Sequence, residues 1–324
     1  MVTDVAPTRF SLLVHCDVPL QLAPMGGVGT PELVAAVANA GGHGMVAAVG
    51  MPASVLEDVL ERVGRLTSRR IGVNFLVPML DREALEAAAT RADVIEFFFG
   101  DPHPELVRTV HAGGALASWQ VGSVPEALAA EDVGCDFVVV QGIEAGGRIR
   151  GREPLAALLA GALQATKLPV VAAGGIATAD SVRAVLDAGA AAARVGTRFL
   201  AAQESGAHPT YQEAVMRAGS DGTVISSAFT VLWPIERSPA RVLRSCVAAA
   251  ETIEDDLVGE TQVGDRTLPV PRFAALAPTV RTTGSVEAMA LYAGEGVGEV
   301  TESEPAMEIV QKLCATISAS SPRC

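Results

Sequence analysis

The sequence predicts an α/β fold: a (β/α)₈ barrel of parallel strands, with a smaller and mostly helical lid domain inserted after the eighth strand. Eight short apolar runs recur over the first 200 residues, and their starts lie 20 to 34 residues apart. Most runs are almost continuously apolar, which is typical of strands buried on both faces of a parallel sheet. Segments with helical patterning separate them, as in a barrel of alternating strands and helices.

The apolar runs are the predicted strands, and the predicted helices carry clear end signals. Thr30 is expected to cap a helix that begins at Pro31 and closes at Gly41, while Ser123 caps another. A doubly wound sheet is the competing architecture, but the first turn, APMGGVGTP, does not have its GxGxxG spacing. The eight runs cover residues 19–25, 45–49, 71–77, 94–100, 115–122, 135–142, 169–176 and 191–200.

The rhythm changes after residue 200, and this change defines the predicted domains. Residues 203–283 contain two helical stretches and a polar, turn-rich section, so they are expected to form the lid or substrate domain. Residues 284–324 are expected to return to the barrel with a final helix. The predicted barrel therefore comprises residues 1–202 and 284–324.

Composition excludes several classes of function. The net charge of −13 makes nucleic acid an improbable partner, because binding it requires a basic surface. Five widely spaced cysteines without a CxxC pair argue against a disulfide framework and a zinc site, so no metal is expected. No signal-peptide pattern and no apolar run near the roughly 20 residues of a membrane span occur, so a cytoplasmic location is expected.

Glycines and amides gather where the barrel strands are expected to end, which is where such barrels place their chemistry. Gly174-Gly175 and Gly196-Thr197 follow the last two strands, a position that often binds phosphate through backbone N–H groups. The alternative is that these glycines only turn the chain. Three amides at strand ends could bond the mixed donor and acceptor edge of a flavin, or satisfy loop backbone. They are Asn74, Gln120 and Gln141.

An ordered set of motifs carries a resemblance to a known family. LAPMGGVGTPELVAAVANAGG, GVNF, QGIEAGG, AAGGIATADSV, VGTRFLAAQES and ALYAGEGVG occur in this order over most of the chain. Together they resemble the nitronate monooxygenase family, formerly called 2-nitropropane dioxygenases. The FMN-dependent enoyl-acyl carrier protein reductases and some NAD(P)H:quinone reductases are similar to the same pattern.

The resemblance implies a TIM barrel that holds FMN at its carboxyl face. It implies oxidation of a small nitronate-like anion, which passes one electron to FMN before O₂ completes the reaction; a homodimer is left open. By the same resemblance, the flavin would be contacted by Ala23, Pro24 and Met25. Its ring or ribityl chain would form hydrogen bonds with Asn74, Gln120 and Gln141. The backbone around the ribityl chain and the phosphate would come from Gly146, Gly147, Gly174, Gly175, Gly196 and Thr197.

The sequence departs from the family pattern at one position. Family members usually carry a histidine directly after EAGG, where it serves as a base, but this chain has Arg148. Arginine stays protonated and cannot be a general base. Arg148 is expected to bind a substrate anion, to stabilise reduced flavin, or to point to solvent or to Glu144. His103, after the fourth strand, is the only histidine on the chemical face and is the candidate replacement base.

Three other functions stay open at this point. One is an NAD(P)H-dependent FMN reductase of the enoyl-acyl carrier protein or quinone reductase type. Another is a catalytically weak FMN-binding protein, because the usual histidine is missing. A flavin-free barrel enzyme with a phosphate substrate is a third option. The resemblance puts Tyr292 near the flavin pocket, although it could equally anchor the tail on the barrel.

Overall fold

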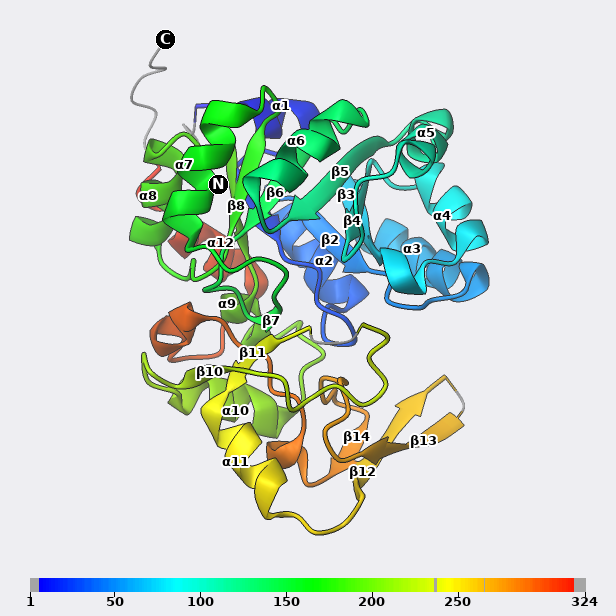
Figure 1. Cartoon of the computed structure of the whole chain (residues 1–324), viewed down its shortest axis with the longest axis vertical. Helices are drawn as coiled ribbons and strands as arrows, with labels where there is room; N and C mark the ends of the chain where they lie inside the picture. The colour runs from blue at the N-terminus through cyan, green and yellow to red at the C-terminus, as the bar shows by residue number, and fades with distance from the viewer. Residues whose placement is uncertain (1–5, 236–237, 265, 318–324) are drawn as a thin grey trace.

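The computed structural model describes residues 6–235, 238–264 and 266–317, and it confirms the predicted barrel (Figure 1). Eight parallel strands lie in the order β1-β9-β8-β6-β5-β4-β3-β2, and each predicted run overlaps one of them. The strands are β1 (Leu20–Leu22), β2 (Gly44–Ala47), β3 (Ile71–Leu76), β4 (Val94–Phe98), β5 (Leu116–Val121), β6 (Phe137–Gln141), β8 (Val170–Ala173) and β9 (Ala192–Val195).

The two ends of the sheet, β1 and β2, close the barrel through a short parallel bridge between Gln21 and His43. The His43 N–H donates to the carbonyl of Leu20 at 2.8 Å, and the Leu22 N–H donates to the carbonyl of His43 at 2.9 Å. Closure removes the exposed strand edges that an open sheet would leave.

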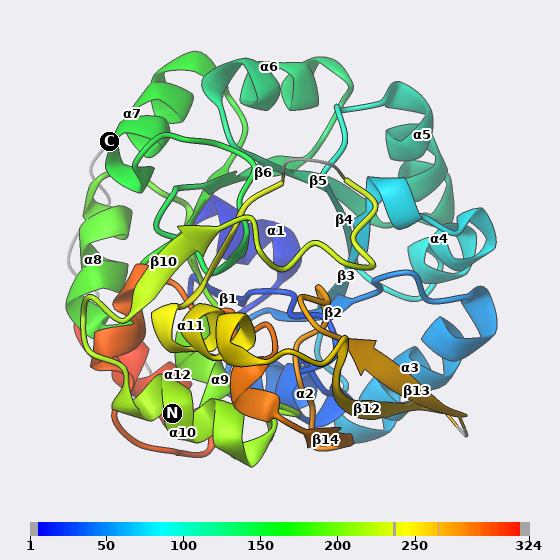
Figure 2. The same ribbon diagram turned by 60° about the horizontal axis from the view of Figure 1, so that its bottom comes forward.

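Helices cover the outside of the barrel, as Figure 2 shows. The predicted caps are confirmed: the Thr30 side chain accepts from the Leu33 N–H, and Ser123 accepts from the Glu126 N–H. The helices of the barrel are α2 (Pro31–Asn39), α3 (Ala53–Leu66), α4 (Arg82–Ala89), α5 (Pro104–Gly113), α6 (Val124–Asp132), α7 (Leu155–Ala165), α8 (Ala179–Asp187), the short α9 (Thr197–Leu200) and the final α12 (Ala306–Leu313). Among the described residues, no helix combines the length and apolar character needed to cross a bilayer.

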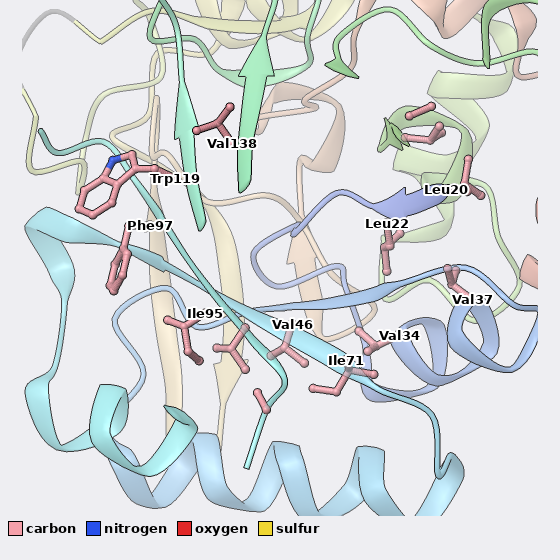
Figure 3. Packing of buried hydrophobic residues seen from close by; sticks show 14 of the residues in the cluster. Leu20, Leu22, Val34, Val37, Val46, Ile71, Ile95, Phe97, Trp119 and Val138 are labelled. Carbon is pink, nitrogen blue, oxygen red and sulfur yellow. The ribbon is translucent and has the colours of Figure 1, made fainter. Parts of the chain in front are cut away.

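The main core lies between the strands and these helices (Figure 3). It is built mostly from aliphatic side chains, in keeping with an aromatic content of only 4%. Trp119 is an exception: it is fully buried, packs on Phe97 with ring centroids 4.8 Å apart, and donates from Nε1 to the Gly100 carbonyl. Burial of each large side chain contributes about 1.5–3 kcal/mol, so this layer supplies much of the stability.

A short helix that the sequence patterns did not reveal, α1 (Arg9–Val14), closes the amino-terminal end of the barrel. Phe10 is fully buried and meets the rings of His43 and Phe137 edge-on, with centroids 5.8 and 5.3 Å away. Thr8 caps the helix, and its hydroxyl also donates to the Ala191 carbonyl at 2.6 Å. Since α1 plugs this end, ligands reach the barrel axis from the other end.

The barrel interior holds a buried ion pair instead of a purely apolar filling. The guanidinium of Arg194 (β9) donates to the carboxylate of Glu96 (β4), and the side chains are 2% and 0% exposed. Arg194 also donates to the amide oxygens of Gln21 and Gln120, and Asn74 donates to Glu96 at 2.9 Å. A buried charge is tolerated only with such partners, because removal from water is costly.

The network reaches His43 and fixes its tautomer. The oxygen of Gln21 accepts from Arg194, so its Nε2 donates to Nδ1 of His43 at 3.1 Å. The ring proton of neutral His43 therefore lies on Nε2. Burial, together with the nearby charge of Arg194, lowers the pKa of His43 from 6.5 to about 3. His43 is thus a neutral structural residue.

The lid differs from the prediction of a mostly helical domain. It holds two helices, α10 (Pro209–Arg217) and α11 (Arg244–Thr252), but also two small sheets. The polar section expected to be irregular is a hairpin, which turns at Gly264 with a φ of 60°. Two-residue hairpin loops favour glycine for this reason. The strands are β10 (Thr223–Ser226), β11 (Ala240–Leu243), β12 (Leu257–Val263), β13 (Arg266–Pro271) and β14 (Thr282–Gly284).

We expect Glu96→Gln to lower the free energy of unfolding by about 3–5 kcal/mol, because it leaves the buried Arg194 without its counter-charge. Glu61→Gln is the matched control: its pair with Arg65 is exposed, so the loss should stay below about 1 kcal/mol. Urea denaturation measures both values. Equal losses in the two variants would contradict the larger contribution that we assign to the buried Arg194–Glu96 pair.

We expect the protein to lose stability as the pH falls from about 6.5 toward 3, in part through His43. In this window the unfolded chain binds a proton at His43 that the folded chain does not, so unfolding is favoured at lower pH. The contribution approaches about 1.4 kcal/mol per pH unit. Urea denaturation between pH 7.5 and 5 should show a shallower pH slope for His43→Asn, and an unchanged slope would argue against this role.

Candidate functional site

A cavity of about 1120 Å³ opens at the carboxyl ends of the barrel strands, beneath the lid. Every residue that the sequence predicted to bind the cofactor lines it. Arg148 and Tyr292 line it too. The predicted cofactor-binding residues that line the cavity together are Ala23, Pro24, Met25, Asn74, Gln120, Gln141, Gly146, Gly147, Gly174, Gly175, Gly196 and Thr197.

Bare glycine backbone forms the wall of the cavity after β8 and β9. Gly174 and Gly175 have φ values of 125° and 69°, which other residues rarely adopt. A Cβ on Gly174 would lie 3.2 Å from the backbone of the loop after β6. The Thr197 hydroxyl accepts from the Gly294 N–H at 2.9 Å and ties this wall to the late LYAG segment.

Gly147 marks open space at the wall of the cavity. Its φ is 78°, and a Cβ built there would meet no other atom within 4 Å. The position therefore needs glycine for its backbone conformation, and it also leaves cavity space that a side chain would fill. The volume and the glycine wall fit FMN, the cofactor that the sequence predicts.

The barrel network decides which amide atoms remain for a ligand. Asn74 turns its Nδ2 toward Glu96, so its Oδ1 is left as an acceptor. Gln120 turns its Oε1 toward Arg194, so its Nε2 is left as a donor. The pair thus offers one acceptor and one donor from the cavity floor, which suits the mixed edge predicted for the ligand.

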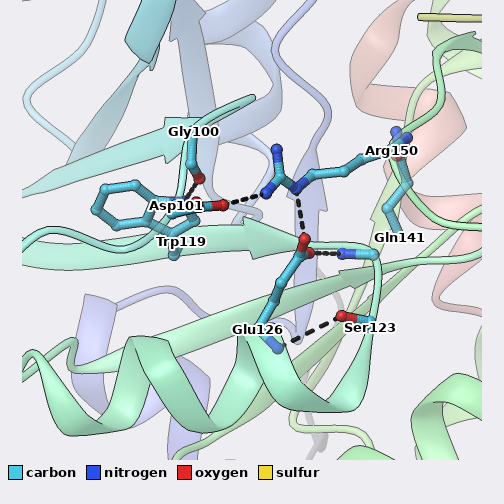
Figure 4. A network of polar contacts seen from close by, with 8 residues as sticks. Gly100, Asp101, Trp119, Ser123, Glu126, Gln141 and Arg150 are labelled. Atoms are coloured by element: carbon cyan, nitrogen blue, oxygen red, sulfur yellow. Dashed lines mark hydrogen bonds and ion pairs between the residues drawn. The ribbon is translucent and has the colours of Figure 1, made fainter.

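Gln141 has a different role in the structure. Its Nε2 donates to the carbonyl of Arg148 at 3.0 Å, and its Oε1 accepts from the Arg150 N–H at 3.3 Å. The amide therefore holds the loop after β6 in place, which is the alternative considered for these amides. Figure 4 shows Gln141 beside Arg150, whose side chain pairs with Asp101 and Glu126.

Arg148 lies where the barrel meets the lid. It belongs to β7 (Gly147–Arg148), which pairs with β11 in antiparallel register opposite Ala240. The side chain is 9% exposed and donates to the carbonyls of Ser238 and Phe229. Its guanidinium carbon lies 4.4 Å from the centre of the Trp233 ring, a favourable cation–π distance.

The charge of Arg148 has only neutral partners among the described residues, where no carboxylate lies within ion-pair distance of it. Its Nε has no hydrogen-bond partner there, and neither does the Nε1 of Trp233 beside it. Burial lowers the pKa of Arg148 and raises the pKa of the adjacent Tyr292, although the Arg148 charge opposes the latter shift. A buried cation with an unpaired donor is suited to hold an anion.

Two expectations about neighbouring groups are not met. Arg148 points neither to solvent nor to Glu144, whose carboxylate instead accepts from the Leu155 N–H at the start of α7. His103 is exposed and lies outside the cavity lining. Its Nδ1 accepts from the Glu105 N–H, so it caps α5. Its position after a barrel strand predicted a catalytic role, but the same position is the N-cap of the helix that follows.

Sequence patterns missed several cavity residues. Trp233 comes from the lid loop and meets Phe99 edge-on at 5.5 Å between ring centroids. Phe99 follows β4 with a φ of 58°, a strained conformation for a non-glycine residue. Arg194, which lines the cavity, and its buried partner Glu96 could have been found, because each is a charged residue inside a run otherwise expected to be a buried strand.

Comparisons with known proteins agree with this geometry. The family model for nitronate monooxygenase matches residues 8–88 and 80–316. The chain belongs to the nitronate monooxygenase family. A probable nitronate monooxygenase of Bacillus subtilis (strain 168) is 27% identical over 344 residues, covering 91% of this chain and 95% of that protein.

Two solved structures share the fold over almost the whole chain. FabK from Thermotoga maritima aligns with a TM-score of 0.78 and 25% identity, covering 95% of each chain. Nitroalkane oxidase from Streptomyces ansochromogenes aligns with a TM-score of 0.76 and 29% identity, covering 95% of this chain and 97% of that one. Membership of this family makes the protein an oxidoreductase enzyme with a TIM-barrel fold.

We expect Gly147→Leu to weaken FMN binding at least tenfold, because the new side chain projects into the cavity. Gly114→Leu is the matched control: Gly114 also has a positive φ, of 93°, and open space around it, but lies outside the cavity lining. Both variants carry a similar backbone cost of about 1–2 kcal/mol. Flavin retention on purification and equilibrium titration with FMN measure the difference, and equal losses would argue against the site.

Proposed function

We propose that the protein is an FMN-dependent oxidoreductase that oxidises a small organic anion, such as a nitronate, with O₂. The observation that carries the proposal is the buried guanidinium of Arg148, which lines the cavity with neutral partners and an unpaired Nε among the described residues. A site with this charge favours an anion over a neutral molecule of the same shape.

The residues that would hold FMN follow from the cavity wall. The Gly174-Gly175 and Gly196-Thr197 turns line the cavity and would offer backbone to the phosphate and ribityl chain, while Ala23, Pro24 and Met25, which also line it, would border the ring. Asn74 Oδ1 and Gln120 Nε2 supply the polar contacts from below. Bound FMN would accept the electrons taken from the substrate and pass them to O₂.

Arg148 explains how the reaction proceeds without the family's histidine. A nitronate is already deprotonated, so its oxidation needs no base. The guanidinium binds and orients the anion by charge-assisted hydrogen bonds. Trp233 packs over the guanidinium and Phe99 packs on Trp233, and this aromatic pair would keep water from the charged head, which strengthens the interaction in a medium of low dielectric constant.

A reductase that takes electrons from NAD(P)H is the second candidate. The sequence resemblance extends to FMN-dependent reductases, and the FabK structure aligns as well as that of the nitroalkane oxidase. Anaerobic mixing separates the candidates. Under our proposal a nitronate bleaches the flavin absorbance and NADPH does not. Rapid bleaching by NADPH alone would favour the reductase, and no bleaching by either would favour a catalytically weak FMN-binding protein.

We expect Arg148→Gln to raise the Kd of small nitronates and carboxylates about 10- to 100-fold, since a hydrogen bond to a charged group contributes about 1.5–3 kcal/mol. Arg152→Gln is the matched control, because Arg152 is exposed on the same loop and does not line the cavity. Titration followed by flavin absorbance measures both. An unchanged Kd in Arg148→Gln would show that Arg148 does not bind the anion and would contradict the proposal.

We expect Arg148→His to gain activity on neutral nitroalkanes, because an imidazole at this position could remove the proton that Arg148 cannot. General-base catalysis typically contributes about 10²–10⁴-fold, so nitroethane turnover should rise at least tenfold. Oxygen consumption with nitroethane, compared with its preformed nitronate, provides the measurement. If the variant oxidises the nitronate but gains nothing on nitroethane, the inferred proximity of position 148 to the substrate is wrong.

A further inference from the structure

The cavity extends beyond the predicted flavin site into a second region, which we call the apolar arm. Its total volume of about 1120 Å³ exceeds the range of roughly 300–1,000 Å³ common for a site that binds one ligand of drug size. A second ligand of considerable length therefore has room beside the cofactor. The arm is lined by Val55 and Val59 of α3, Val263 and Leu268 of the β12–β13 hairpin, and Leu276 and Val280 of the following loop.

Large aliphatic side chains are unusually exposed along the apolar arm. Val55 is 47% exposed, Val263 58%, Leu268 43% and Val280 63%. They come from segments far apart in the sequence, yet they border one continuous cavity. Single exposed apolar residues are ordinary, but their convergence from different segments marks a binding groove.

The charges along the arm leave its centre apolar. Glu32 is the only acidic residue among the described lining residues, and it pairs with Arg62 at 2.5 Å. Arg281 is exposed and also lines the cavity. An aliphatic chain could lie along the apolar side chains of this wall without desolvating an unpaired carboxylate.

We propose that the substrate is an amphipathic aliphatic anion whose charged head binds at Arg148 and whose unbranched alkyl chain lies along the apolar arm. The head-group assignment rests on the proposed function, and the chain is the new element. The cavity joins the two ends without interruption, since Arg148, Val55 and Leu268 all line it. Chain length would then be a determinant of specificity, set by α3 and the hairpin.

Straight-chain carboxylates from propionate to decanoate, which are inert toward oxidation, test the inference. Isothermal titration calorimetry on the purified full chain with its cofactor gives each Kd without relying on turnover. Full burial of a methylene tightens binding about fourfold, and the arm is partly open, so we expect roughly two- to fourfold per methylene. A Kd that does not change with chain length would overturn the inference.

Four aspartate variants locate the chain in the structure. Val55→Asp and Leu268→Asp place a charge in the arm and should reduce the ratio of the propionate Kd to the decanoate Kd at least tenfold. Leu66→Asp and Leu257→Asp are matched controls, because these leucines are similarly exposed on the same helix and hairpin but lie outside the cavity lining. Equal reductions in both sets would overturn the placement.

The same titrations separate this inference from the proposed function. If binding tightens with chain length but does not depend on Arg148, the apolar arm binds the alkyl chain but the assignment of the anion to Arg148 is wrong. If propionate binding depends on Arg148 but longer chains gain nothing, the proposed function stands and the arm does not bind substrate.

Discussion

One buried cation, Arg148, constrains both the position of the lid and the charge of the cavity. Its backbone joins the lid sheet through β7 and β11, and its guanidinium donates to the lid carbonyls of Phe229 and Ser238. On the barrel side, Gln141 Nε2 donates a hydrogen bond to the backbone carbonyl of Arg148. Because the described partners of the side chain are all neutral, we propose that the charge that fixes the lid also attracts an anionic ligand.

Arg194, another buried cation that lines the same cavity, differs from Arg148 because it has a carboxylate partner. Its charge is matched by Glu96, and the surrounding amides complete its hydrogen bonds. The barrel floor is therefore rigid and electrically neutral, while the wall at Arg148 is positive. We propose that a protein with a net charge of −13 nevertheless binds an anion at this wall, because local charge and burial can outweigh the overall charge.

The parts of the fold that local sequence determines were predictable. Buried strands show as continuous apolar runs, and Thr30 and Ser123 cap their helices through residues three positions away. Contacts between distant segments left no such pattern: β7 and β11 lie about 90 residues apart, and Trp233 reaches the cavity from the lid. The ordered motifs predicted a set of cofactor-binding residues that all line one cavity, whereas His103 lies outside it, because strand ends and helix caps coincide.

The central claim is that an anion binds the unpaired Nε–H of Arg148, and nitrogen NMR observes that group directly. In uniformly ¹⁵N-labelled protein, the Arg148 Nε–H signal is assigned by its loss in Arg148→Lys. Titration with propionate should shift this signal in a saturable way and slow its exchange with solvent, because the proton becomes engaged in a charge-assisted hydrogen bond. A signal that stays unchanged while propionate binds elsewhere would contradict the account.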